Sequence, residues 1–308
     1  MFLAAFSAPV WAVEARVASV NVTLRFPFIF PILPSSRAML LAKEEYVEQT
    51  FFFRTFRERL DAGFSSQEIL HGMKNEILAA TNLPTAISIV LTEVKLSGKM
   101  YLATRRLPHY FTPFQTFVFE EAEREDGRFD FRVALKILEQ EADYRSKAPT
   151  PQGTFFYQFE TLSRNRLGFD RGLEAIANDP IFNDDWRRWI NVVLRRQIGF
   201  VDVADLVYVR SAHYEKREGE EEEATLFGER EGRIARASRG RDPLFFFSAL
   251  ARHLGYPTVP RIRRVQEREE FTLHDLRRQV EQLEHRVQLL QEELKGGINI
   301  ERFYVKKN

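Results

Sequence analysis

Helix start signals recur throughout this chain, and they restrict it to a helical fold. Thr112 and Thr150 both stand directly before a proline. A threonine hydroxyl can cap a helix, and proline suits the first helical position because its missing N–H has no partner there in any case. Ser65 and Glu68 have the three-residue spacing of a capping box. These patterns predict that helices begin at these points.

Apolar residues between these boundaries recur three and four positions apart, which is the spacing of one helix face. The residues expected to face the core are Phe53, Phe56, Leu60, Leu70, Met73, Ile77, Ala80, Ile87, Val90, Leu91, Val94, Phe114, Phe117, Val118, Ala134, Ile137, Leu138, Phe155, Phe159, Leu162, Trp186, Ile190 and Val193. The sequence has no pair of alternating strand patterns and no Asn-Gly hairpin turn. It therefore predicts an all-α protein: a multi-helix globular domain, then a charged linker, then a C-terminal coiled-coil helix.

Four aspartates are expected to begin further helices. Asp130, Asp184 and Asp242 each precede an apolar pattern of helical period. Residues 201–214 have strand-like branching, but Asp202 near their start and the lack of a partner strand favour a helix. The residues expected in the core face of the helix after Asp242 are Phe245, Phe246, Leu250 and Leu254.

The composition suits a soluble globular protein with a large core. Hydrophobic residues make up 44% of the 308 residues, and the 28 phenylalanines outnumber the nine tyrosines and three tryptophans. A net charge of +1 gives the chain as a whole no bias toward polyanions. The lack of cysteine excludes disulfides, thiolate catalysis and cysteine metal sites. It also fits a reducing compartment, so we expect a cytoplasmic protein that does not bind a membrane.

Changes in sequence texture divide the chain into six parts. They are a non-globular N-terminal extension (1–38), a helical domain (39–214), a charged acidic and basic linker (215–242), a short helix with a basic loop (243–265), a coiled coil (266–296) and a tail (297–308). The apolar run at residues 1–13 is too short to span a bilayer. Because the helical pattern opens at Met39, we expect translation to start there; a cleaved secretion signal and an ordered apolar arm are the alternatives.

A heptad repeat near the carboxyl end is the most specific pattern in the chain. Its apolar residues are Leu273, Leu276, Val280, Leu283, Val287, Leu290 and Leu294. A seam with this period lets two helices wrap around each other. With Leu273 at position a, valine occupies the next two a positions and leucine the d positions, which favours two parallel strands. The expected role of this segment is self-association into a homodimer.

The length of this repeat leaves a second interpretation open. About three heptads are short for an isolated coiled coil, and such a helix is marginal in water. The e and g positions show no run of opposite charges, so the choice of partner is weakly specified. The alternative is a terminal helix that folds back onto its own domain.

The only concentrated charge lies in residues 230–264, which hold nine arginines, no lysine and two acidic residues. The candidate nucleic-acid-binding residues are Arg230, Arg233, Arg236, Arg239 and Arg241. The paired N–H groups of an arginine guanidinium match the oxygens of a phosphate, and the small residues between the arginines let a nucleic-acid strand approach the backbone. Against this stand four consecutive glutamates at 220–223 and the lack of a known nucleic-acid-binding motif. Self-neutralisation is the simpler account, and a nucleic-acid-binding accessory protein is the alternative function.

A second group of basic residues lies near two helix boundaries. The candidate anion-binding residues are Arg105, Arg106, His109, Arg164 and Arg166. The first three precede a proline-capped helix, where free N–H groups and the helix dipole favour an anion. The alternative is that these arginines cap helix ends and pair with nearby glutamates. Glu68 and His71 have the spacing of half a di-iron site, but no second such pair exists and the capping box explains Glu68.

The sequence contains no motif for catalysis. It lacks a Gly-x-x-x-x-Gly-Lys-Ser/Thr phosphate loop, Gly-x-Gly-x-x-Gly, His-Glu-x-x-His and Gly-x-Ser-x-Gly. We therefore expect no catalytic residue, metal or cofactor. The leading hypothesis is a non-enzymatic helical interaction or scaffolding protein, with a further protein partner that the sequence does not identify. An enzyme or anion-binding protein with a site near His109 is the third hypothesis.

Four stretches of the sequence also carry a resemblance. They are LPHYFTPF (residues 107–114), RNRLGFD (164–170), VDVADLVY (201–208) and ASRGRDPL (237–244). Together they resemble an uncharacterised family of bacterial proteins of planctomycete type, from residue 39 to about residue 294. The resemblance implies that the first 38 residues lie outside the common region. It implies no activity, cofactor or catalytic residue.

Overall fold

The computed structural model describes residues 40–124, 129–194, 202–214, 224–261, 276–284 and 286–287, with the side chain of Val193 left out. The chain divides into two compact units, Met1–Ser36 and Arg37–Asn308, and every described residue belongs to the second. The described residues are predominantly helical and contain no strand beyond an isolated bridge between Ser211 and Phe227. The predicted all-α class is confirmed for these residues. None of their helices is long and apolar enough to cross a membrane.

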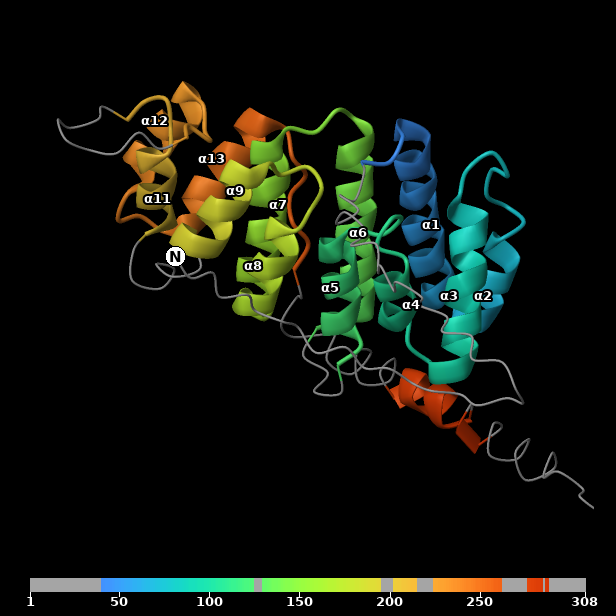
Figure 1. Cartoon of the computed structure of the whole chain (residues 1–308). Coiled ribbons are helices and arrows are strands. Elements are labelled where there is room, and N and C mark those ends of the chain that lie inside the picture. The colour runs from blue at the N-terminus through green and yellow to red at the C-terminus, as the bar shows by residue number, and fades with distance from the viewer. Residues whose placement is uncertain are drawn as a thin grey trace, which may run out of the picture. The chain divides into compact units, whose positions relative to one another are not determined.

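Most of the helices follow one another with short connections. The first are α1 (Lys43–Asp61), α2 (Ser66–Met73), α3 (Leu83–Ser97), α4 (Tyr101–Arg106), α5 (Pro113–Ala122) and α6 (Phe131–Ser146). They are followed by α7 (Pro151–Asn165), α8 (Phe169–Ala177), α9 (Asp184–Arg188), the π-helical turn η1 (Trp189–Leu194), α11 (Val203–Val209), α12 (Glu229–Ser238) and α13 (Pro243–Leu254), as Figure 1 shows. Residues 276–284 and 286–287 are also helical, and we call them the C-terminal helix.

Side-chain caps begin most of these helices where the sequence predicted. The Thr112 hydroxyl accepts a hydrogen bond from the backbone N–H of Gln115 at 3.1 Å, and Gln115 closes a capping box. The other predicted N-caps that the structure confirms are Ser65, Asp130, Thr150, Asp202 and Asp242. Each cap satisfies an N–H group that has no partner within its helix.

The start of α9 differs from the prediction by one residue. Asp184 was expected as the N-cap and is wrong in that role, because Asn183 occupies the position. The side-chain oxygen of Asn183 accepts a hydrogen bond from the N–H of Trp186 at 3.0 Å. After Arg188 the helix continues as η1, a π-helical turn in which backbone hydrogen bonds join residues five apart rather than four.

α13 buries a different pair of phenylalanines from the predicted one. Phe246 and Phe247 are buried, whereas the side chain of Phe245 is 69% exposed, so its predicted place in the core is wrong. Consecutive helical residues point about 100° apart, so one helix face cannot bury all three phenylalanines. The ring of Phe247 lies 6.0 Å from the ring of Phe159 in α7, and this contact fixes the orientation of α13.

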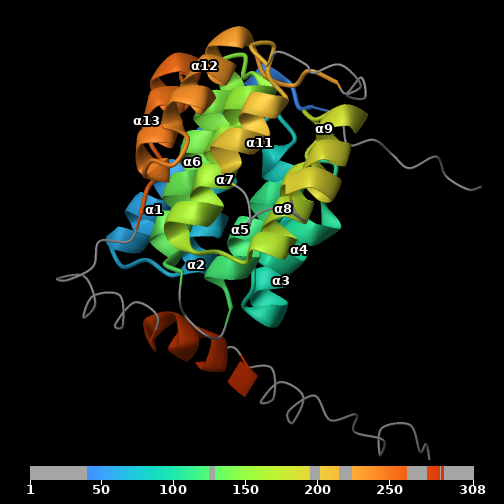
Figure 2. The same ribbon diagram turned by 90° about the vertical axis from the view of Figure 1, so that its left-hand side faces the viewer.

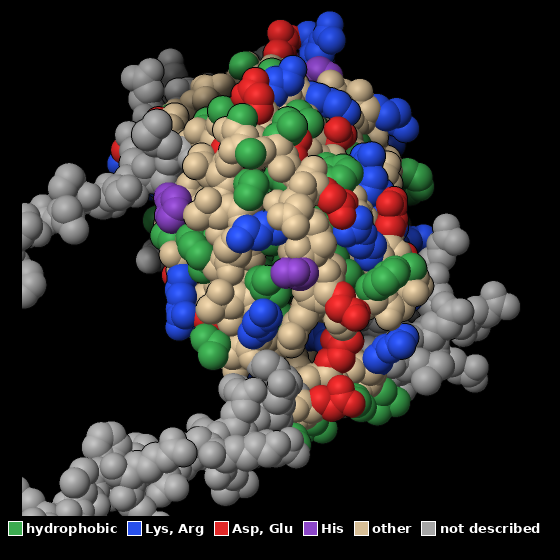
Figure 3. All heavy atoms as spheres, turned by 90° about the vertical axis from the view of Figure 1, so that its right-hand side faces the viewer, with side chains coloured by type: hydrophobic (Ala, Val, Ile, Leu, Met, Phe, Trp, Pro, Cys, Tyr) green, Lys and Arg blue, Asp and Glu red, His purple; other side chains and the backbone are tan. Residues whose placement is uncertain are grey.

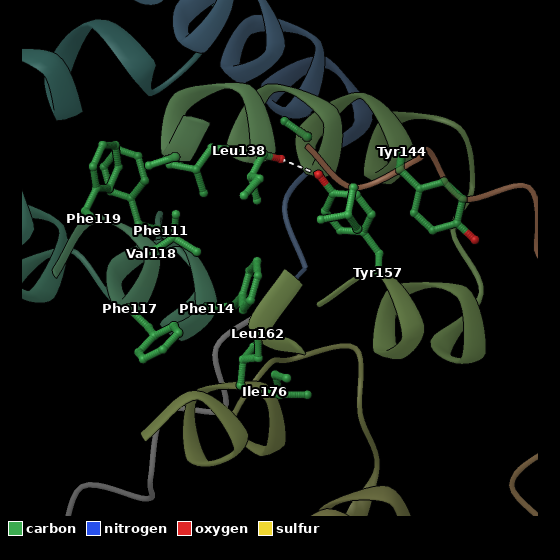
Figure 4. Packing of buried hydrophobic residues seen from close by; sticks show 14 of the residues in the cluster. Phe111, Phe114, Phe117, Val118, Phe119, Leu138, Tyr144, Tyr157, Leu162 and Ile176 are labelled. Carbon is green, nitrogen blue, oxygen red and sulfur yellow. Dashed lines mark hydrogen bonds between the residues drawn. The ribbon is translucent and has the colours of Figure 1, made fainter. Parts of the chain in front are cut away.

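The core lies where α5, α6, α7 and α8 meet. α6 packs against α1, α5 and α7, so both of its sides contribute to the packing. Phe114 and Phe117 of α5, Leu138 of α6 and Leu162 of α7 belong to one buried cluster (Figure 4). The hydroxyl of Tyr157 donates a hydrogen bond to a backbone carbonyl of α6 at 2.8 Å. Phenylalanine therefore fills this core, as the composition indicated.

A charged cluster is buried within this helical packing. Arg145 of α6 donates to Glu141 at 2.9 Å and pairs with Asp179, which lies just beyond α8. Gln158 of α7 donates to both carboxylates, at 2.9 and 3.0 Å. The guanidinium also lies 5.9 Å from the ring centre of Tyr46 in α1. The cluster therefore links α1, α6, α7 and the segment after α8.

Part of the segment expected as a charged linker is helical and packed. α12 lies within residues 215–242, contacts α11 and α13, and fully buries Ala235. His253, near the end of α13, has its Nε2 atom 3.1 Å from Oε1 of Glu231, near the start of α12. The two helices therefore run antiparallel and form a hairpin, which faces the viewer in Figure 2.

Candidate interaction surface

The C-terminal helix contacts the body of the protein through two polar side chains. Arg278 donates to the carbonyl of Ala122, the last residue of α5, at 3.1 Å. Gln282 donates to the carbonyl of Gly98, the C-cap of α3, at 3.4 Å. Carbonyls at a helix C-terminus are free and carry the negative end of the helix dipole, so they favour a cation such as Arg278. This helix is red in Figures 1 and 2.

An aromatic ring and a glycine complete the docking contact. The guanidinium of Arg278 lies 5.0 Å from the ring centre of Phe131, at the start of α6. Gly98 has a φ of 70°, in the left-handed region that favours glycine. A Cβ atom on Gly98 would lie 2.8 Å from Cγ of Gln282, which is closer than side-chain atoms tolerate. Gly98 therefore both ends α3 and lets the C-terminal helix approach.

These contacts come from the face of the helix that lies opposite the heptad seam. In the predicted register, Arg278 occupies position f and Gln282 position c, which face outward in a two-stranded coiled coil. The described seam residues and their exposed fractions are Leu276 (51%), Val280 (47%), Leu283 (58%) and Val287 (50%). The docked helix therefore leaves its apolar seam about half exposed. The other predicted seam residues, Leu273, Leu290 and Leu294, lie outside the described residues.

A groove of about 900 Å³ lies between the seam and the corner that joins α1 to α2. Its apolar lining includes Leu60, Phe64 and Phe131 of the body, with Leu276 and Val280 of the C-terminal helix. Phe64 is 54% exposed, although most phenylalanines of this chain that the structure describes are buried. Charged side chains also line the groove, among them Asp61 and Arg132, which pair at 2.8 Å. We call the seam and this groove together the seam surface.

Two glutamates beside the docking contacts have raised pKa values. Burial raises the pKa of Glu123, and the nearby Arg278 guanidinium only partly offsets this effect. The Glu123 carboxylate accepts hydrogen bonds from the N–H groups of Met100 and Tyr101, both at 2.9 Å. Burial also raises the pKa of Glu281 on the C-terminal helix. Docking removes these carboxylates from water, which disfavours their charged form.

The structure pairs three of the five predicted anion-binding residues with carboxylates. The pairs are Arg105 with Glu120 (3.0 Å), Arg106 with Glu93, and Arg164 with Glu160. His109 and Arg166 are exposed, and neither has an ion-pair partner within the described ranges. Of the five, only Arg105 lines the groove of about 370 Å³ that α4, α5 and α8 border. Anion binding at these residues stays a prediction.

The five predicted nucleic-acid-binding arginines all have exposed side chains. Arg230, Arg233 and Arg236 lie on α12, and Arg239 and Arg241 lie in the turn that leads to α13. Two of them have carboxylate partners: Arg233 pairs with Glu229, and Arg239 pairs with Asp205. The structure thus brings these arginines together on one hairpin.

The predicted capping box of Ser65 and Glu68 is confirmed. The Glu68 carboxylate accepts a hydrogen bond from the N–H of Ser65 at 3.0 Å, and the Ser65 hydroxyl accepts one from the N–H of Glu68 at 3.3 Å. These hydrogen bonds lower the pKa of Glu68. Among the residues that the structure describes, no group of three or more His, Cys, Asp or Glu side chains could hold a metal ion.

Sequence reasoning missed the residues that hold the C-terminal helix in place. The heptad pattern identifies the seam, but nothing in it marks Arg278 or Gln282 as contact residues. Phe64 and Phe131 of the groove also follow no periodic pattern that points to the C-terminal helix. Contacts between segments so distant in the chain leave no local trace in the sequence.

Comparisons with protein-family models, curated proteins and solved structures found no match. The resemblance to a planctomycete-type bacterial family therefore stays a prediction.

Proposed function

We propose that this chain is a helical interaction protein that forms a homodimer through the seam of its C-terminal helix. The observation that carries the proposal is a half-exposed row of valine and leucine on a helix whose opposite face is already docked. Contiguous exposed apolar side chains are typical of interaction sites. A second copy of the chain is the partner, because a seam with valine at a and leucine at d is complementary to itself.

Docking on the body offsets the main weakness of a short coiled coil. A free helix of about three heptads is marginal because ordering its backbone costs conformational entropy. The contacts of Arg278 and Gln282 hold this helix before a partner arrives. A surface ordered in advance loses less entropy on binding, so it binds more tightly. Folding back and self-association, which the sequence presents as alternatives, are therefore compatible.

The groove beside the seam supplies apolar area that a short coiled coil lacks. Phe64 and Leu60 border it on the side of the body, and Leu276 and Val280 border it on the side of the helix. A partner helix along the seam would cover part of this lining, and burial of apolar area is favourable by about 25 cal/mol per Å². The lack of cysteine suits a reducing compartment, and we place this function in the cytoplasm.

Light scattering on the full-length protein, from low to high micromolar concentration, tests the proposal. We expect twice the chain mass of 36.1 kDa at high concentration. Replacing Val280 and Leu283 by aspartate should return the mass of one chain, because two charges would then lie in the seam.

The matched control replaces Val47 and Leu78 by aspartate. These residues are 47% and 61% exposed, like the seam pair, but they lie outside the seam surface. We expect the control variant to remain dimeric. A wild-type protein of one-chain mass at high micromolar concentration, or a seam variant that stays dimeric, would show that the proposal is wrong.

A further inference from the structure

Several arginines of the α12–α13 hairpin lack the carboxylate partners that most arginines of the preceding helices have. In the preceding helices most arginine side chains pair with carboxylates, as Arg54 does with Glu139 at 3.1 Å. Within the described ranges, Arg230, Arg236 and Arg241 are exposed and have no carboxylate partner. The acidic run at 220–223, considered as their internal partner, lies outside the described residues. Among the described residues no carboxylate neutralises these guanidiniums, and an external anion can pair with them.

Helix geometry arranges three of these arginines in a row. Arg230, Arg233 and Arg236 follow at three-residue steps on α12, and residues at that spacing are neighbours on a helix surface. The opposite face of α12 is buried, with Ala235 fully covered. The row therefore faces away from the body of the protein.

The turn after α12 extends this basic row toward α13. The Arg239 guanidinium lies 4.3 Å from the ring centre of Tyr208 and pairs with Asp205, so its position is fixed. Gly240 has a φ of 66°, and a Cβ atom added to it would meet nothing within 4 Å. The Gly240 N–H donates to Asp202 at 3.3 Å, which holds the turn against the start of α11, and Arg241 is exposed directly after Gly240.

An exposed aromatic ring lies next to this basic turn. Phe245 follows Arg241 by four residues, and its 69% exposure is the highest among the large apolar side chains that the structure describes. α13 does not need this ring for its own packing, because Phe246 and Phe247 already contact Phe156 and Phe159 of α7. An exposed ring beside unpaired guanidiniums is the combination that single-stranded nucleic acids use, through base stacking and phosphate contacts.

We propose that the α12–α13 hairpin binds single-stranded nucleic acid. Arg230, Arg236 and Arg241 contact phosphates, because the guanidinium fork donates paired hydrogen bonds to phosphate oxygens. Phe245 stacks on an unpaired base, which a duplex does not offer. The contacts are sequence-tolerant, because neither phosphates nor stacked faces distinguish one base from another.

The packing of α13 favours nucleic acid over an anionic membrane. The apolar face of α13 is buried against the body, and only Leu244 and Phe245 of its first turn are exposed phenylalanine or leucine side chains. Interfacial helices instead present a whole apolar face to the lipid. On the face of the protein in Figure 3, basic and acidic side chains are interspersed, whereas residues 229–254 hold six arginines and three acidic residues. The hairpin is thus a local basic surface on a nearly neutral chain.

Fluorescence anisotropy with a short labelled oligothymidine and the full-length protein tests the phosphate contacts. We expect saturable binding at low salt that weakens steeply as salt is added. Replacing Arg236 and Arg241 by glutamine should weaken binding and reduce the slope of log K against log salt by about 0.7 for each arginine removed. The matched control replaces Lys95 and Arg188 by glutamine, which removes two exposed charges elsewhere, and should leave affinity and slope unchanged.

A Phe245→Ser variant tests the stacking contact separately. It should weaken binding to oligothymidine by about ten-fold with the salt slope unchanged, because stacking releases no counterions. Its thermal unfolding should match that of the wild type, since Phe245 lies outside the core. Binding to a duplex should be weaker than to the single strand and insensitive to Phe245→Ser.

Three results would overturn the proposal. The first is no binding of oligothymidine at low salt. The second is equal loss of affinity in the hairpin and control variants, which would show a diffuse charge effect. The third is binding to vesicles of phosphatidylserine and phosphatidylcholine that the hairpin substitutions abolish while oligothymidine binding persists. The proposal does not depend on dimerisation, because seam variants that are monomeric should keep their affinity for the probe.

Discussion

At the scale of single residues, the buried Arg145 cluster has the greatest electrostatic consequence. Burial alone opposes a charged guanidinium, but Asp179 and Glu141 together raise the pKa of Arg145, so it stays protonated. Burial raises the pKa of Glu141, although Arg145 lowers it. The cluster therefore holds one cation between two carboxylates in a site without water access, where removing one member leaves the others uncompensated.

Replacing Arg145 by methionine should cost about 3–5 kcal/mol of unfolding free energy, because two buried carboxylates lose their partner. Urea denaturation measures this loss. Arg59→Met is the control, because Arg59 pairs with Glu76 at 2.7 Å in an exposed position. An exposed pair contributes about 0–1 kcal/mol, so this variant should remain close to the wild type. An equal loss of unfolding free energy in the two variants would show that the buried Arg145 cluster is no more important for stability than an exposed ion pair.

Glu141 also predicts a pH dependence of stability. Its folded pKa is raised above the ordinary value of 4.5, so the folded state binds a proton more readily than the unfolded state does. The stabilisation from this proton is present below pH 4.5 and is lost as the pH rises through the raised pKa. Glu141→Gln cannot ionise and should lack this decline, which urea titrations from pH 4 to 8 would detect. If the difference in unfolding free energy between the wild type and the variant stays constant with pH, the predicted pH dependence is wrong.

At the scale of elements, the C-terminal helix depends on a glycine in another helix. Gly98 and Gly255 end α3 and α13 with the same φ of 70°. A Cβ atom on Gly98 would meet Gln282, whereas one on Gly255 would meet nothing within 4 Å. Both glycines therefore need the left-handed backbone conformation, but only Gly98 lies against a side chain of the C-terminal helix.

This pair isolates the docking contact of the C-terminal helix. Gly98→Ala and Gly255→Ala should each lose roughly 1 kcal/mol of stability, because alanine is strained in the left-handed region. Only Gly98→Ala should raise hydrogen exchange in residues 276–284, since the new methyl group displaces Gln282. Equal exchange rates in both variants would show that the helix does not depend on this contact.

The sequence could predict those helix starts whose capping contacts lie within a few neighbouring residues. Thr112 and Thr150 cap their helices through side-chain contacts within three residues, so the sequence alone contains all the partners. Asn183 and Asp184 are both good caps, and only the backbone path chooses between them.

Tertiary contacts decided what the sequence could not predict. The rotation of α13 depends on the distant Phe159, so Phe245 could not be placed from its own neighbours. The burial of Arg145 depends on Asp179, which lies outside its helix. The docking face of the C-terminal helix likewise depends on Gly98, far earlier in the chain.

At the scale of the whole molecule, the proposed dimer fixes where the two bodies lie. Each C-terminal helix contacts its own body through positions c and f, and the seam lies on the other side. Two helices joined through their seams therefore carry their bodies on the outside of the pair. The bodies need not touch each other for the dimer to form.

A single cysteine at residue 280 tests this arrangement, because the native chain has none. Val280 occupies an a position, and matching a positions face each other in a parallel pair. Val280→Cys should therefore form an interchain disulfide quickly under mild oxidation. Val47→Cys has the same 47% exposure and should not. Non-reducing gel electrophoresis measures both, and equal cross-linking would contradict the parallel seam.

The outward placement of the bodies has a consequence for binding strength. A dimer built this way presents the body surfaces outside the groove twice, facing in different directions. A long ligand that reaches both copies would leave only after releasing both, so its residence time would exceed that on one chain by a factor set by the effective local concentration. Because the polar face of the C-terminal helix holds the seam outward, it would determine whether a long ligand is bound by one chain or by two.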